Sequence, residues 1–354
     1  MNLYIHLPTN LKIFELFLEN KEYILWWNSK SEKEIAGFFL KNFPWEVMNE
    51  LSPQYETNFV SLRKLKQIDD NILNNIQWIY YWSDNCEYLA PTKLEVEKAL
   101  NLYNEANKKY FFKKWKKWFV LVTPYTWNKI IERLKESLDY LNEQWNFEVV
   151  INDLWILRYV QNSCPNLKPI VGRLLHKLMK TPLVDTYWNH AHVPWALIKN
   201  KTPQQIDIIQ QEIIKNQNNF YNSIELSFKP YTKFLDKNNI ERVWTDFMEN
   251  REKLYKKNYE KWIDLYYPWA LVFTGRLCDT SAIENPDRWN YATDDVCPRT
   301  CWKYDIFYKL KTVWYDLIQR WNSWFRSEIN IERLDKDFIY NKQNRIVYAP
   351  FITV

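Results

Sequence analysis

The sequence contains very little glycine. Only 3 of its 354 residues are glycine, whereas an average protein has about 7%. Glycine-rich loops are what bring a protein backbone close to the phosphates of a nucleotide. No such loop follows any apolar run of strand length, which argues against a dinucleotide-binding site.

Long apolar runs and cysteine-rich patterns are also missing. No stretch of about eighteen apolar residues occurs, so we expect no membrane-spanning segment. The first residues, Met1–His6, lack the basic start and the small-residue cleavage site of a signal peptide, from which we expect a cytoplasmic protein. Five cysteines are too few for a disulfide scaffold in a chain of this length, and a reducing compartment would not preserve disulfides.

The charge balance is mildly basic, with a net charge of +5. Basic residues gather at Lys113–Lys117, whose sequence is KKWKK. A basic run of this kind can contact nucleic acid, which makes RNA one expected partner. A solvated helix end before a strand is the more frequent explanation for such a run.

Tryptophan is abundant where glycine is scarce. The chain has 20 Trp, which together with its 3 Gly come close to an ordinary glycine complement. Trp145 follows a helix-like segment, residues 130–144, at a position where glycine commonly ends a helix in the left-handed conformation. Trp is followed by Asn at six places, which are Trp27, Trp127, Trp145, Trp188, Trp289 and Trp321.

We therefore hypothesise that many of these tryptophans are glycine in the native protein. The source would translate the UGA codon as glycine, and its richness in Lys, Asn, Ile and Tyr suits an AT-rich genome. The alternative is a protein that is truly rich in tryptophan. If the hypothesis holds, Trp302 beside Cys301 and Trp289 make the cysteine region bulkier as written than it is in the native protein.

From residue 74 onward, apolar runs of strand length alternate with helical segments. The predicted strands are 76–81, 119–123, 148–151, 168–171, 223–227 and 263–267, and the predicted helices are 91–108, 128–144 and 154–161. Apolar strands separated by helices are typical of a parallel sheet buried on both faces. We predict an α/β fold with a mostly parallel TIM-type (β/α) barrel over residues 74–354 and an N-terminal extension over residues 1–73. An open doubly wound sheet is the alternative.

The C-terminal region carries three clustered cysteines, Cys278, Cys297 and Cys301. Thiolates suit iron–sulfur clusters and zinc, but the paired C-x2-C knuckles of zinc ribbons are absent. A fourth ligand would be Cys86 or Cys164. Cys86 follows a predicted barrel strand, and the C-terminal strand ends of a parallel barrel converge on one face. Cys164 follows a helix and so points to the opposite face. We favour Cys86; a zinc site and unliganded buried thiols are the alternatives to a cluster.

Several segments resemble, in order along the chain, the collagenase-like peptidase U-32 family. Residues 149–158, VVINDLWILR, resemble its VVNDxGxLR segment, with Trp155 at a glycine position. The other similar segments are Ser83–Pro91, 171–175 (VGRLL), 274–278 (TGRLC) and 319–322 (QRWN, where the family has QRGN). The resemblance covers roughly residues 74–325.

The resemblance implies a TIM-type barrel with a 4Fe-4S cluster on Cys86, Cys278, Cys297 and Cys301. It implies an enzyme of oxygen-independent hydroxylation, or another modification, of a quinone precursor or an RNA base. One alternative is a non-catalytic cluster-bearing subunit in a hetero-oligomer with a related family member. Another is a peptidase, although neither an H-E-x-x-H motif nor a nucleophile elbow is found.

Three polar residues are weak catalytic candidates. Asp153 ends a predicted strand, where barrel enzymes place reactive groups, but capping the following helix is the more frequent role of Asp there. Arg173 ends the next strand and would bind an anionic substrate or form a structural ion pair. Glu225 would face the barrel interior as an acid or base, or face solvent.

Overall fold

The structure is a computed structural model of the chain. It describes residues 3–7, 60–61, 64–65, 67–68, 76–110, 118–126, 128–144, 146–176, 199–221, 225–249, 259–275, 278–283, 297, 300–302, 306–308, 317–320, 322–341 and 343–349. Lys113–Lys117, whose basic run suggested RNA, lies outside these residues.

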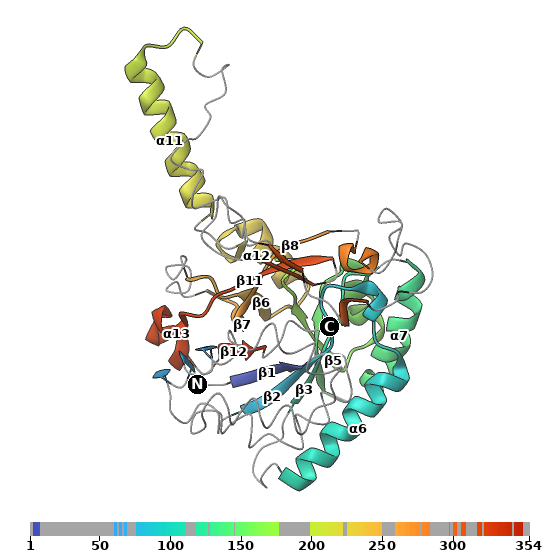
Figure 1. Cartoon of the computed structure of the whole chain (residues 1–354). Coiled ribbons are helices and arrows are strands. Elements are labelled where there is room, and N and C mark those ends of the chain that lie inside the picture. Colours follow the sequence, from blue (N-terminus) through green and yellow to red (C-terminus); the bar gives the residue numbers. More distant parts are fainter. Residues whose placement is uncertain are drawn as a thin grey trace.

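Eight parallel strands close into a barrel (Figure 1). Around the barrel they follow the order β1 (Leu3–Leu7), β12 (Arg345–Tyr348), β7 (Trp262–Tyr267), β6 (Arg242–Asp246), β5 (Leu167–Val171), β4 (Phe147–Ile151), β3 (Trp118–Val122) and β2 (Ile76–Tyr81). Every neighbouring pair is parallel. The predicted parallel TIM-type barrel is confirmed.

The barrel takes its first strand from the segment that we expected to be an extension. Strand β1 pairs with β2 on one side and with β12 on the other, so that Ile5 lies opposite both Ile79 and Tyr348. Leu3, Tyr4 and Ile5 are all buried. The barrel thus begins at the third residue of the chain, well before residue 74.

Helices follow β2, β3 and β4 and lie along one side of the barrel (Figure 1). The α-helices among the described residues are α6 (Lys93–Tyr110), α7 (Asn128–Glu143), α8 (Leu154–Ser163), α11 (Pro203–Tyr221), α12 (Lys229–Lys237) and α13 (Lys336–Tyr340). Thr92 and Glu95 start α6 with a capping box, in which each accepts a hydrogen bond from the backbone N–H of the other. Helix α11 projects away from the barrel. No helix in the described part of the chain is long and apolar enough to cross a membrane.

The sixth strand of the barrel is not where the sequence predicted it. Residues Glu225–Ser227 form a 3-10 turn, η5, just before α12, and not a strand. The strand is β6, whose sequence RVWTD carries a charge at each end. A charged residue inside a barrel strand hides the apolar pattern, and β6 tolerates its charges because both find buried partners of opposite sign.

A second sheet is inserted between β7 and β12. Its four strands run in the order β8 (Trp269–Thr274), β11 (Ser323–Ser327), β10 (Leu317–Arg320) and β9 (Ile306–Tyr308), and all its pairs are antiparallel. Strand β8 begins two residues after β7 ends, so the insert starts at the C-terminal end of the barrel. It also contains the 3-10 turns η7 (Asp279–Ala282) and η8 (Thr300–Trp302). All three C-terminal cysteines therefore belong to the insert.

The interior near the N-terminal ends of the strands holds an ion cluster around Asp264. Its Oδ1 lies 2.6 Å from Nη1 of Arg242, and the Tyr80 hydroxyl donates to its Oδ2 at 2.5 Å. Arg345 donates two hydrogen bonds to Glu148, at 2.6 and 3.0 Å. Each charge has a partner of opposite sign, which makes its burial tolerable. The cluster joins β2, β4, β6, β7 and β12.

Candidate functional site

The C-terminal end of the barrel gathers polar side chains from five of its strands or the loops directly after them. They are His6 from β1, Asp84 after β2, Arg173 after β5, Asp246 from β6 and Tyr266 from β7. All five are at most 4% exposed. Barrel enzymes place their reactive groups at this end, so we treat these residues as the polar part of a candidate site.

Arg173 forms the centre of this polar group. Its guanidinium pairs with Asp84 through Nε and with Asp246 through Nη1, the latter at 2.8 Å. It also lies 4.2 Å from the centroid of the Tyr266 ring. Of the two roles that the sequence suggested, the structure shows the ion pair. Two carboxylates flank one guanidinium, which leaves a local excess of negative charge.

Asn152 and Gly172 hold the backbone beside Arg173. The Asn152 side chain donates to the Thr123 carbonyl at 2.8 Å and accepts from the Leu174 N–H at 3.1 Å. A Cβ at Gly172 would lie only 2.1 Å from Oδ1 of Asn152. Only glycine therefore fits at this position while Asn152 keeps its hydrogen bonds.

His6 is neutral and its tautomer follows from its two partners. Nε2 lies 2.6 Å from the Trp82 carbonyl, which can only accept, so Nε2 carries the proton. Nδ1 then accepts from the Tyr266 hydroxyl at 3.0 Å. Complete burial lowers the pKa of His6 to about 4, although the charge of Asp84 opposes this shift. His6 can thus accept a proton only at a high cost in free energy.

The other two catalytic candidates lie elsewhere. Asp153 caps α8, because its Oδ1 accepts from the Trp155 N–H at 2.7 Å and from the Ile156 N–H at 3.4 Å. This is the role that the sequence favoured. Glu225 is in the turn η5 and not in a barrel strand. The expectation that it could face the barrel interior from a strand is therefore wrong.

Four of the five cysteines lie near one another. Cys86 and Cys301 are buried, whereas Cys278 and Cys297 are half-buried. Burial raises the pKa of Cys86 well above its usual value, and the charges of Cys301, Cys297 and Cys278 raise it further. The pKa of Cys301 is also raised, first by burial and then by Cys278, with Cys297 adding to the effect. The loop after β2 and the insert thus bring their thiols within electrostatic range.

Cys164 is separate from this group. Its Sγ lies 3.7 Å from Oδ1 of Asp139, and burial together with Asp139 raises its pKa to about 12. It borders a cavity of about 670 Å³ that is also lined by Glu148 and Arg242, near the N-terminal strand ends. Cys164 therefore faces the opposite end of the barrel, as we expected from its position after a helix.

Hydrogen bonds hold the segments that carry Cys86, Cys278 and Cys301. The Arg320 side chain in β10 donates from Nε to the Cys301 carbonyl at 3.3 Å. Gln319, next to it, donates to Asp279 at 2.7 Å, and Asp279 directly follows Cys278. Thr274, four residues before Cys278, lies 3.5 Å from the Asn85 side chain. The Thr274–Asn85 contact thereby joins the insert to the loop after β2, and the other two hydrogen bonds hold Cys278 and Cys301 within the insert.

The donor set suits an iron–sulfur cluster or another soft metal centre. Thiolates are the ligands of such clusters, and a bound metal deprotonates them despite a raised pKa. Within the part of the chain that the structure describes, no three side chains of His, Cys, Asp or Glu already converge as a metal site. Ligation of all four cysteines would thus draw the thiols closer together.

Sequence reasoning missed His6, Asp84, Asp246 and Tyr266. Strand β6 was not predicted, so Asp246 could not be placed at a strand end. His6 lies directly after the apolar stretch Leu3–Ile5, which would have marked it as a strand-end residue had that stretch been assigned to the barrel. Tyr266 lay within a predicted strand, but its sequence does not show which face it occupies.

Comparison of the chain with protein-family models, with curated proteins and with solved structures finds no match.

Proposed function

We propose that this chain is an iron–sulfur protein whose 4Fe-4S cluster is ligated by Cys86, Cys278, Cys297 and Cys301. The cluster would lie at the C-terminal end of the barrel, where the insert meets the loop after β2. We further propose that the protein is an enzyme of oxygen-independent hydroxylation, or another modification, of a quinone precursor or an RNA base.

One observation carries the ligand set. The thiol of Cys86 comes from the first third of the chain, and yet the charges of the three C-terminal cysteines all raise its pKa. Four neighbouring thiolates would repel one another, and a bound metal centre offsets that repulsion. Four cysteines are the usual ligands of a 4Fe-4S cluster. The fifth cysteine, Cys164, interacts with Asp139 instead.

The proposed reaction draws on the polar residues beside the thiols. A bound cluster would supply one-electron chemistry. Arg173, His6 and Tyr266 belong to the same end of the barrel, where they would orient a substrate and exclude water. Asp84 lies two residues before Cys86 and binds Arg173, so it links the polar group to the proposed cluster loop.

Iron analysis tests the ligand set. Protein purified without oxygen is compared with the variants Cys86→Ala and Cys164→Ala, and iron, acid-labile sulfide and visible absorbance are measured. We expect about four irons per chain in the unmodified protein and in Cys164→Ala, and loss of most iron in Cys86→Ala. A colourless, iron-free protein after anaerobic reconstitution, or equal iron loss in both variants, would contradict the proposal.

The substrate is tested separately. Nucleic acid that co-purifies with the protein and carries a hydroxylated base would favour RNA. Accumulation of an unhydroxylated quinone precursor in cells that lack the gene would favour the quinone pathway. A stable complex with a related protein, together with no change in either product, would contradict the enzymatic proposal and favour a cluster-bearing subunit.

A further inference from the structure

Trp82 has a backbone conformation that tryptophan rarely adopts. Its φ is 102°, in the region that a Cβ disfavours and that glycine enters freely. The other residues with positive φ, among those described, are all asparagines, which tolerate this region. Trp82 immediately follows β2 and its carbonyl accepts the hydrogen bond from His6. The backbone at the edge of the candidate site thus has the geometry of a glycine.

Two further tryptophans are buried with an unsatisfied polar group. Trp244 and Trp269 are both 0% exposed, and the indole Nε1 of each has no hydrogen-bond partner within the described part of the chain. Buried indole N–H groups normally find a partner, because burial without one costs free energy. At neither position does the described structure offer the indole N–H a hydrogen-bond acceptor.

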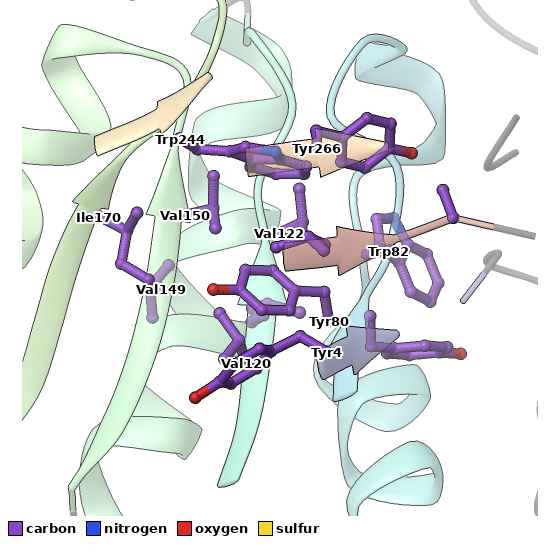
Figure 2. Packing of buried hydrophobic residues seen from close by; sticks show 14 of the residues in the cluster. Tyr4, Tyr80, Trp82, Val120, Val122, Val149, Val150, Ile170, Trp244 and Tyr266 are labelled. Carbon is purple, nitrogen blue, oxygen red and sulfur yellow. The ribbon is translucent and has the colours of Figure 1, made fainter. Parts of the chain in front are cut away.

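Trp244 fills the centre of the candidate site. Its ring centroid lies 5.0 Å from that of Tyr266, 5.4 Å from that of His6 and 5.7 Å from that of Tyr80. The Arg173 guanidinium lies 5.5 Å from it. Figure 2 shows the Trp244 and Tyr266 side chains next to one another, with Tyr80 beside them. The indole therefore lies among the side chains of His6, Tyr266 and Arg173.

We propose that residues 82, 244 and 269 are glycine in the native protein, and that the space filled by the Trp244 indole is a pocket for a neutral planar ring. The scarcity of glycine and the excess of tryptophan support the first part independently of the geometry. The pocket for a neutral planar ring names a substrate class for the proposed function. Only the chemistry performed on that ring rests on the proposed function; binding of the ring does not.

The walls of the pocket determine the class of ligand. Faces and edges of Tyr80, Tyr266 and His6 surround the space, and aromatic walls favour a planar ring. The charged groups are one guanidinium and two carboxylates, and His6 is neutral, so an anion is repelled. A hydroxylated but uncharged ring such as phenol fits these walls, whereas benzoate does not.

The first experiment is mass spectrometry of peptides from the protein isolated from its natural source. We expect glycine at positions 82, 244 and 269. Tryptophan at position 244 would overturn the whole proposal. This measurement needs no folded variant, and its result also defines which residues the recombinant protein must carry.

The second experiment measures ligand binding with two recombinant proteins. One carries glycine wherever the native peptides do, and the matched control differs only in keeping Trp244. Ligand-observed NMR with phenol and with benzoate is expected to show phenol binding to the first protein alone, with benzoate at least about tenfold weaker. Equal binding of phenol by both proteins, or by neither, would overturn the pocket. The test uses no iron, so its failure is distinct from the absence of a cluster.

Discussion

Replacing Trp82 by glycine is expected to give a more stable protein than replacing it by alanine. Both substitutions remove the same buried indole, so the lost burial cancels in the comparison. At a φ of 102° the alanine Cβ is strained, which costs about 1–2 kcal/mol. Glycine loses more backbone entropy on folding, about 0.5–1 kcal/mol. The net advantage of glycine at this position is therefore about 0.5–1 kcal/mol.

Trp244 provides the matched control because it lies within β6, outside the residues with positive φ. There alanine is expected to be more stable than glycine by about 0.5–1 kcal/mol. Equilibrium urea unfolding followed by circular dichroism measures all four variants under the same conditions. If alanine matches or exceeds glycine at position 82, or if the order is the same at both positions, the backbone argument is refuted.

Three further predictions concern buried ionisable side chains, and each is measured by urea unfolding. The pKa of His6 is about 4 in the folded protein and 6.5 in the unfolded chain. The free energy of unfolding should therefore fall as the pH drops from 6.5 towards 4, by up to about 3 kcal/mol. His6→Gln should reduce this dependence on pH. Burial raises the pKa of Glu328 from 4.5 to about 7, so stability should fall as the pH rises through that interval, and an unchanged slope in Glu328→Gln would contradict the assignment. Arg173→Met leaves the carboxylates of Asp84 and Asp246 buried without their cation and should cost about 3–5 kcal/mol at neutral pH, whereas a loss below 1 kcal/mol would mean that the ion pairs contribute little.

Local apolar patterning was enough to predict most of the barrel. The strand over 76–81 and the helix from residue 128 have the predicted bounds, or nearly so, because each is a short apolar run or an amphipathic segment with clear ends. Strand β12 was missed because its sequence is only RIVY, and its arginine binds Glu148 inside the barrel. Such long-range ion pairs place charge in a strand where the sequence alone suggests a loop.

The sequence also predicted one part of the candidate site, the four cysteines, and not the other, the ion pairs of Arg173. The spacing of the C-terminal cysteines and the position of Cys86 after a strand were visible in the sequence, and convergence of strand ends then predicted that they would lie near one another. The pairing of Arg173 with Asp84 and Asp246 was not visible, because it depends on contacts between residues about 70 to 90 positions apart. Only closure of the barrel brings those partners together.

The pairing of β1 with β12 sets an order of events during synthesis. The barrel cannot close until β12 has left the ribosome, since no other described strand completes the ring. All four clustered cysteines precede β12 in the chain. The loops that carry them are therefore made while the future interior is still accessible from one side, and a metal centre delivered at that stage would be enclosed as the last strand joins the first.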